Sequence, residues 1–99
     1  MAQYQIAVTE SAKDDLSVYT AFERKAIASA IRAQLTYQPM IETRRRKKLR
    51  DNPVASWELR IGKYRVFYEI DGMSRKVTII AIGHKDHNAL FIRGKEVQL

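Results

Sequence analysis

The stretch "SWELRIGKYRVFYEI" at positions 56–70 decides the fold, because it reads as two strands joined by a tight turn. Residues 56–61 alternate apolar and charged side chains, which is the period of a strand with one buried face. Residues 64–70 follow after only Gly62 and Lys63, and a two-residue loop that begins with glycine is typical of a β-hairpin. The stretch therefore predicts two antiparallel strands.

The turn also predicts which residues face each other across the hairpin. With a two-residue loop, Arg60 lies directly opposite Arg65, and directly opposed residues share a face of the sheet. One face, which we expect to pack against helices, carries Trp57, Leu59, Ile61, Tyr64, Val66 and Tyr68. The other face, which we expect to be open, carries Glu58, Arg60, Arg65, Phe67 and Glu69.

The opposed arginines leave two interpretations of that second face. Like charges directly opposite each other destabilise a sheet, so something must compensate for Arg60 and Arg65. Glu58 and Glu69 can interleave with them, which would make the face a solvated pattern of ion pairs. Alternatively, an external anion binds between the arginines, and the face is an anion site built on rigid strands.

Upstream of the hairpin, the sequence predicts one strand and two helices. Residues 4–8 alternate loosely and suit a short strand. Apolar residues then recur every three or four positions up to about residue 38, after a cap at Thr9 or Ser11, with a break near residues 20–22. Pro39 ends the second helix, because the residue before a proline avoids helical geometry.

Downstream, residues 76–82 are apolar on both faces, as in a central strand, and residues 83–99 suit a short helix and a loose tail. The element order β-α-α-β-β-β predicts a single α+β domain over residues 1–99. It has an N-terminal strand, a two-helix hairpin and a three-stranded antiparallel meander, in one sheet with the helices on one face.

Positive charge is concentrated in the run "RRRKKLR" at 44–50. The net charge is +7, and without these six cations 12 of the 18 basic residues remain against 11 acidic ones. Such a run favours a polyanion such as nucleic acid, an acidic protein or an anionic membrane, although a solvated loop has the same composition. The candidate RNA-binding residues are Arg44, Arg45, Arg46, Lys47, Lys48 and Arg50.

Several classes of protein are excluded by what the chain lacks. It has no cysteine, which is compatible with a reducing cytoplasm, and no basic segment followed by an apolar one at its start, so we expect no signal peptide. No apolar run approaches the roughly 20 residues of a membrane span. We therefore expect a cytoplasmic protein without a membrane partner.

The segment "GHKDH" at 83–87 follows the last predicted strand and offers His84, Lys85 and His87 to the open face. Two histidines three residues apart suggest a metal, but no further ligand cluster accompanies them, so we expect neither a metal nor another cofactor. The chain also lacks a phosphate-binding glycine loop and the surroundings of a serine nucleophile.

The segments "ELRIGKYRVFYEID" and "IGHKDH", with "YQIAVTESAKDDL" at the start and "KKLR" before the hairpin, resemble the RelE/ParE family of toxins from toxin–antitoxin pairs. The resemblance covers almost the whole chain and implies the α+β fold predicted above. It implies a cognate acidic antitoxin as partner. For RelE-like members it implies mRNA cleavage on the ribosome, and for ParE-like members inhibition of DNA gyrase without nuclease activity.

The resemblance also assigns roles to individual residues. Arg65 matches the arginine that RelE-like enzymes place on the scissile phosphate, and Lys85 a basic residue that stabilises the developing charge. Phe91 falls where those enzymes often have a tyrosine. Ser56 and Glu58 fall where some members carry lysines, while other members use a glutamate there as base.

Our predicted site is therefore Arg65, Arg60 and Lys85 on the phosphate, with Glu58 as base and His84 or His87 as candidate acid. The alternative is that both histidines are plain surface residues. The first functional hypothesis is a metal-independent, ribosome-dependent endoribonuclease. The alternatives are a gyrase inhibitor without an active site and a degenerate member that only binds its antitoxin. In the basic run, we expect Leu49 to anchor the segment and the six cations to grip the RNA backbone.

Overall fold

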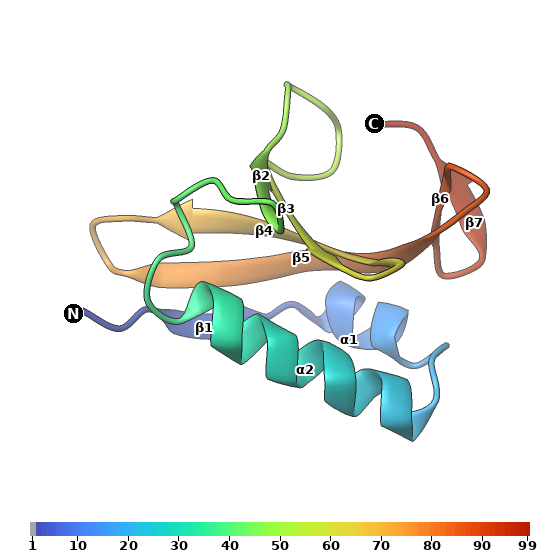
Figure 1. Cartoon of the computed structure of the whole chain (residues 1–99), viewed down its shortest axis with the longest axis horizontal. Coiled ribbons are helices and arrows are strands. Elements are labelled where there is room, and N and C mark those ends of the chain that lie inside the picture. The colour runs from blue at the N-terminus through green and yellow to red at the C-terminus, as the bar shows by residue number, and fades with distance from the viewer. Residues whose placement is uncertain (1) are drawn as a thin grey trace.

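Two helices pack on one side of a sheet whose strands come from both ends of the chain (Figure 1). The computed structural model describes residues 2–99. The elements, in chain order, are β1 (Gln5–Val8), α1 (Glu10–Leu16), α2 (Ala21–Leu35), β2 (Arg46–Lys48), β3 (Trp57–Ile61), β4 (Tyr64–Asp71), β5 (Lys76–Asp86), β6 (Ala89–Ile92) and β7 (Lys95–Val97).

A threonine caps the start of each helix, and the second, Thr20, lies where the sequence predicts a break. The Thr9 hydroxyl accepts a hydrogen bond from the Ala12 backbone N–H at 3.1 Å and begins α1. Thr20 begins α2 through a capping box, in which its hydroxyl accepts from the Glu23 N–H and the Glu23 carboxylate accepts from the Thr20 N–H. The cap at Thr9 rather than Ser11 follows from its extended backbone.

The α+β class and the helices on one face are confirmed, but the sheet is larger than the sequence predicted. The strands run in the order β2-β3-β4-β5-β6-β7, and β1 pairs with β5 in parallel, so the sheet is not wholly antiparallel. Both β1 and β6 pair with β5, the former at residues 76–79 and the latter at residues 84–86. The long strand β5 is therefore the centre of the fold.

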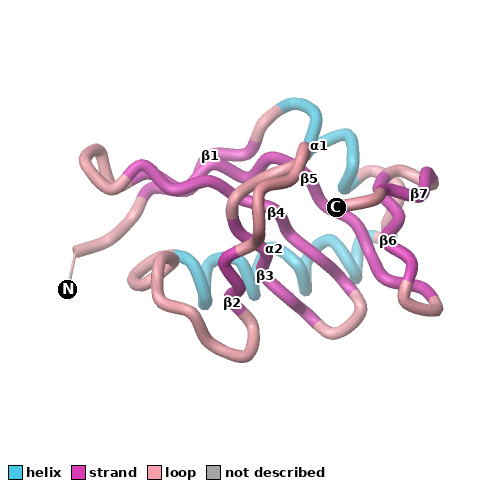
Figure 2. Tube along the Cα trace, turned by 90° about the horizontal axis from the view of Figure 1, so that it is seen from above, coloured by secondary structure: helices cyan, strands magenta, loops and turns pink. Residues whose placement is uncertain are grey.

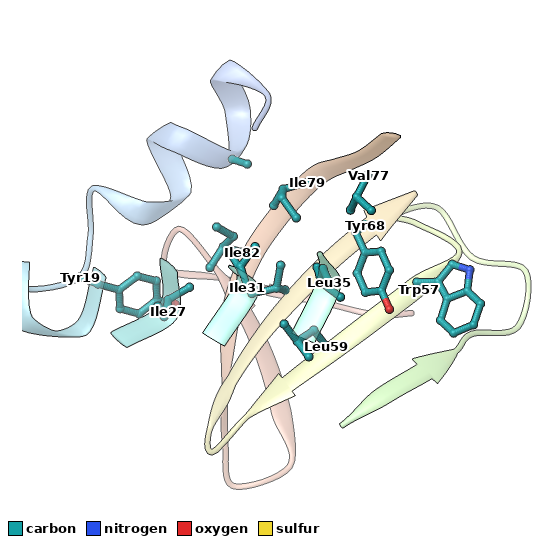
Figure 3. Close-up of a cluster of buried hydrophobic side chains, with 12 residues drawn as sticks. Tyr19, Ile27, Ile31, Leu35, Trp57, Leu59, Tyr68, Val77, Ile79 and Ile82 are labelled. Atoms are coloured by element: carbon teal, nitrogen blue, oxygen red, sulfur yellow. The ribbon is translucent and has the colours of Figure 1, made fainter. Parts of the chain in front are cut away.

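The predicted hairpin register is confirmed over its whole length, including Arg60 opposite Arg65. Its apolar face meets the helices in the main core, where Leu59 and Val66 are fully buried. Figure 3 shows side chains of α2 lying against those of β3, β4 and β5. The buried members of this core are Ala12, Tyr19, Ile27, Ile31, Leu35, Trp57, Leu59, Val66, Tyr68, Val77, Ile79 and Ile82.

The prediction that the opposite face is open is wrong for two of its five residues. Phe67 is fully buried and Glu58 is 3% exposed, because the segment between β2 and β3 and the β6–β7 hairpin fold over this side (Figures 1 and 2). A second, smaller core results, with Ala55, Phe67, Ala81 and Leu90 buried. The predicted anchor Leu49 packs against this core, as expected.

A β-bulge supplies part of this second core. The pairing of β4 with β5 shifts between Phe67 and Tyr68, which face Ala81 and Ile79. Ile80 is thus the extra residue, and both Ile80 and Ala81 belong to the second core. An apolar run such as residues 76–82 predicts burial on both sides, but it cannot locate the bulge.

The prediction of a short helix and a loose tail after residue 82 is also wrong. Strand β5 continues to Asp86, and β6 and β7 follow as an antiparallel meander. The first turn consists of His87 and Asn88, with φ of 50° and 68°, a pair of left-handed residues that suits a two-residue hairpin loop. Neither residue is glycine, so the usual sequence signal of such a turn is missing.

Candidate functional site

The charged part of the second face centres on one buried carboxylate and two arginines. The Arg60 Nε donates to Glu58 Oε1 at 2.9 Å, and the Glu58 side chain is 4% exposed whereas that of Arg60 is 47% exposed. Glu58 also lies opposite Lys47 on β2. The predicted interleaving of Glu58 with the arginines therefore exists, and it engages Arg60.

Arg65 has no carboxylate partner within residues 2–99. Its Nη1 donates to the backbone carbonyls of Gly62 at 2.7 Å and Tyr64 at 2.9 Å, so the side chain lies back along its own turn. Its Nε is buried and makes no hydrogen bond to any described residue. Burial lowers the pKa of Arg65, the Glu58 charge opposes that change, and the Arg60 charge adds to it. Among residues 2–99, no carboxylate forms an ion pair with this guanidinium, although it is partly buried.

Lys85 shares the face of Arg65, whereas His84 and Phe91 do not. Arg65 pairs with Gly83, and side chains two residues apart on a strand point the same way, which places Lys85 on that side. His84 lies opposite Tyr64, on the side of the helices. Phe91 pairs with His84 and stacks on its ring, with centroids 5.8 Å apart.

His84 belongs to an aromatic cluster between the helices and β6. Its Nδ1 lies 2.7 Å from the Tyr19 hydroxyl, and the two rings meet edge to face. Burial, together with the nearby Tyr64, Glu23 and Asp15, raises the pKa of Tyr19 to about 12. Tyr19 therefore keeps its proton near neutral pH, and its hydroxyl can donate a hydrogen bond to the His84 Nδ1. The hydrogen bond between Tyr19 and His84 therefore links the segment between α1 and α2 to strand β5.

His87 lies at the tip of the β5–β6 hairpin, with a side chain that is 96% exposed, and its Nδ1 is 2.8 Å from Asp86 Oδ1. The structure thus brings Arg60, Arg65, Lys85 and Glu58 to one face and separates them from His84, His87 and Phe91. The roles of the two histidines as acids stay predictions. Among residues 2–99, no three His, Asp or Glu side chains gather as metal ligands would.

The middle of the basic run, Arg46–Lys48, forms the edge strand β2, and the cations of the run differ in their surroundings. Arg46 turns inward, where its Nε donates to the Ile41 carbonyl at 2.8 Å and its Nη1 to the Gln34 carbonyl at 2.9 Å. Lys48 Nζ lies 5.3 Å from the centre of the Trp57 ring. These two cations therefore help to attach β2 to the domain.

Four cations of the run have side chains without a hydrogen bond, ion pair or ring contact to the described part of the chain. They are Arg44, Arg45, Lys47 and Arg50. A strand of only three residues that carries charged side chains also protects the sheet edge against pairing with another chain. The run combines structural cations and unengaged ones, a difference that the sequence letters do not show.

Asp15 and Arg93 form a partly buried ion pair that the sequence patterns do not predict. Asp15 is 1% exposed, and its carboxylate accepts from the Ile82 N–H at 3.0 Å and from the Arg93 Nε at 2.8 Å. Between β1 and β6, no strand within residues 2–99 pairs with this edge of β5, and Asp15 accepts the Ile82 N–H there instead. An acid among the apolar positions of a helix, here between Ala12 and Leu16, is the signal that could have found it.

Comparison with known proteins identifies the class of protein to which this chain belongs. The sequence model of the ParE toxin of type II toxin–antitoxin systems matches residues 6–89. Because this range is most of the chain, the protein belongs to that family and, with it, to the RelE/ParE toxin superfamily.

A solved structure supports the same assignment. A chain of the toxin–antitoxin complex RelBE2 from Mycobacterium tuberculosis superposes with a TM-score of 0.73 at 26% sequence identity. The alignment covers 84% of this chain and 99% of that chain. None of the curated proteins matches the sequence. None of the helices within residues 2–99 has the length and apolar character needed to cross a membrane.

Proposed function

We propose that the protein is the toxin of a type II toxin–antitoxin pair and that it stops translation by cutting mRNA on the ribosome. The observation that carries the proposal is the pair of opposed arginines on rigid strands, in which a buried carboxylate, Glu58, pairs with Arg60 but not with Arg65. The likeness to a chain of a RelBE2 complex supports the toxin role and a cognate antitoxin, for which we propose an acidic segment that competes for the basic surface.

The proposed reaction needs little more than charge stabilisation and positioning. The RNA 2′-hydroxyl attacks the adjacent phosphorus, the bond from phosphorus to the 5′-oxygen breaks, and one proton is taken while another is given. Arg65 suits the phosphate because its planar fork matches two oxygens and stays charged. Lys85 on the same face would stabilise the developing negative charge, and Arg60 would assist.

The direct test is to express the protein in cells and map the 5′ ends of transcripts. We expect new ends that depend on the toxin, and we expect Arg65→Ala to abolish them while the fold remains. Lys25→Ala, which removes an exposed cation of α2, is the matched control and should cut like the unaltered protein. Unchanged transcripts together with unchanged translation would contradict the proposal.

For the basic run we propose a grip on the RNA backbone through Arg44, Arg45, Lys47 and Arg50. Replacing Arg44 and Arg45 by Gln should weaken binding to ribosomes and lower the salt slope by roughly one for each phosphate that is no longer neutralised. Cleavage by enzyme that is already bound should change little in a single-turnover assay. A collapse of that bound rate would place the run inside the active site instead.

A second candidate is inhibition of DNA gyrase without nuclease activity. Two observations favour it: the matching family is the ParE toxin, and His84, His87 and Phe91 lie apart from the arginine pair. This candidate predicts gyrase trapped on DNA and a DNA-damage response, with transcripts intact. Immunoprecipitation of gyrase after induction, followed by measurement of bound DNA, distinguishes the two candidates.

A further inference from the structure

Glu58 is buried next to two arginines but forms an ion pair with only one of them. Its carboxylate holds the Arg60 Nε at 2.9 Å, while Arg65, directly opposite Arg60, bonds to backbone carbonyls. The other carboxylate on this face, Glu69, already accepts the Ser56 N–H at 3.0 Å. The face therefore holds more positive charge than its own carboxylates neutralise.

The Arg65 Nε shows that this arrangement is incomplete. It is the buried side-chain donor that lacks a hydrogen bond among residues 2–99, and a buried polar group without a partner costs free energy. The main-chain carbonyls that accept hydrogen bonds from the Arg65 Nη1 carry no net charge. An oxyanion placed between the two strands would supply both the missing acceptor and the missing charge.

We propose that Glu58 is an internal counter-ion of an oxyanion site formed by Arg60 and Arg65, and that a phosphate group displaces the Glu58 carboxylate from Arg60 when it binds. Glu58 then sets the affinity of the site by competing with the ligand, and it is a positioning residue for Arg60 rather than a base. Lys47, opposite Glu58, and Lys85, on the face of Arg65, surround the site with further positive charge.

The burial of Glu58 agrees with this role. With 4% of its side chain exposed and its oxygen engaged by Arg60, the carboxylate is poorly placed to reach a hydroxyl of RNA. Arg60, in contrast, is about half exposed and can turn toward solvent without unfolding the strand. The preference of the site for an oxyanion follows from its charges alone. Only the identity of the natural ligand, an RNA phosphate, rests on the proposed function.

The test is a titration of the free protein with inorganic phosphate, observed through the 15Nε resonances of Arg60 and Arg65. We expect both resonances to move together in the unaltered protein. Glu58→Gln should bind phosphate about tenfold more tightly, because one charge-assisted competitor is removed. Glu96→Gln, which removes an exposed carboxylate of β7, is the control for net charge and should bind like the unaltered protein.

Phosphate affinity that is unchanged or weaker in Glu58→Gln, or resonances of Arg60 and Arg65 that do not move in the unaltered protein, would overturn the proposal. The titration of the unaltered protein keeps the test valid if the variant does not fold. Because no ribosome is present, failure of the mRNA hypothesis would leave this result untouched. Loss of cutting by Glu58→Gln with unchanged phosphate affinity would instead assign Glu58 as the base.

Discussion

The two faces of the sheet differ in how their contents are arranged along the chain. The face toward the helices is one apolar core, in which alternate residues of β3 and β4 meet the stripes of α1 and α2. The opposite face combines a smaller apolar core with a charged strip, and its cover comes from residues 49–56 and from β6 and β7. One face stabilises the fold, and the other combines stability with charges available for binding.

The largest expected effect is a loss of stability that differs between the main core and the second core. Leu59→Ala, at a fully buried position of the main core, should lower the free energy of unfolding by about 4 kcal/mol. Leu90→Ala, 3% exposed in the second core, should cost about 2 kcal/mol, because a cavity near the surface can collapse or hydrate. Urea unfolding followed by tryptophan fluorescence measures both, since Trp57 lies in the main core. Equal losses would mean that the two cores are one energetic unit.

The next largest effect is the loss of stability expected when the ion pair between Asp15 of α1 and Arg93, which follows β6, is removed. Asp15→Asn keeps an acceptor for the Ile82 N–H but loses the charged bond to Arg93, and we expect a loss of about 2 kcal/mol. Hydrogen exchange should show β6 and β7 opening before the rest of the sheet. Asp14→Asn is the matched control, because that carboxylate lies 3.9 Å from Arg93 and is mostly exposed. Protection that falls equally in all strands would contradict a local role.

The smallest expected effect is a change in stability at acid pH, caused by the contact between Glu23 of α2 and Tyr64 of β4. The hydrogen bond from the Tyr64 hydroxyl, followed by those of Thr20, lowers the pKa of Glu23 from 4.5 to about 2. A lowered pKa stabilises the fold above pH 4.5, and this contribution disappears as the pH falls toward 2. Tyr64→Phe should therefore make the decline of stability in this range shallower.

Melting temperatures measured at several pH values between 2 and 6 test this expectation. Tyr4→Phe serves as the control, because the Tyr4 hydroxyl makes no hydrogen bond within residues 2–99. An acid profile of Tyr64→Phe that matches that of the unaltered protein would show that the capping box alone fixes the charge of Glu23.

Much of the charged site could be predicted because it depends on neighbours in sequence. The two-residue turn at Gly62 and Lys63 set the register, and the register placed Arg60 opposite Arg65. The face of the sheet on which His84 lies could not be predicted in this way. It depends on the pairing of β4 with β5 across a turn and a bulge, and on the contact with Tyr19. No local pattern near "GHKDH" contains that information.

The sequence by itself determined the α+β class, the hairpin register and the face that meets the helices, because alternation and short turns act over a few residues. The tertiary structure alone decided what covers the opposite face, which cations of "RRRKKLR" remain unengaged within residues 2–99, and that Glu58 pairs with Arg60 while Arg65 donates to backbone carbonyls. Those outcomes depend on burial and charge contributed by segments far apart in the chain. The interactions that produce them form only when the folded chain brings those segments together.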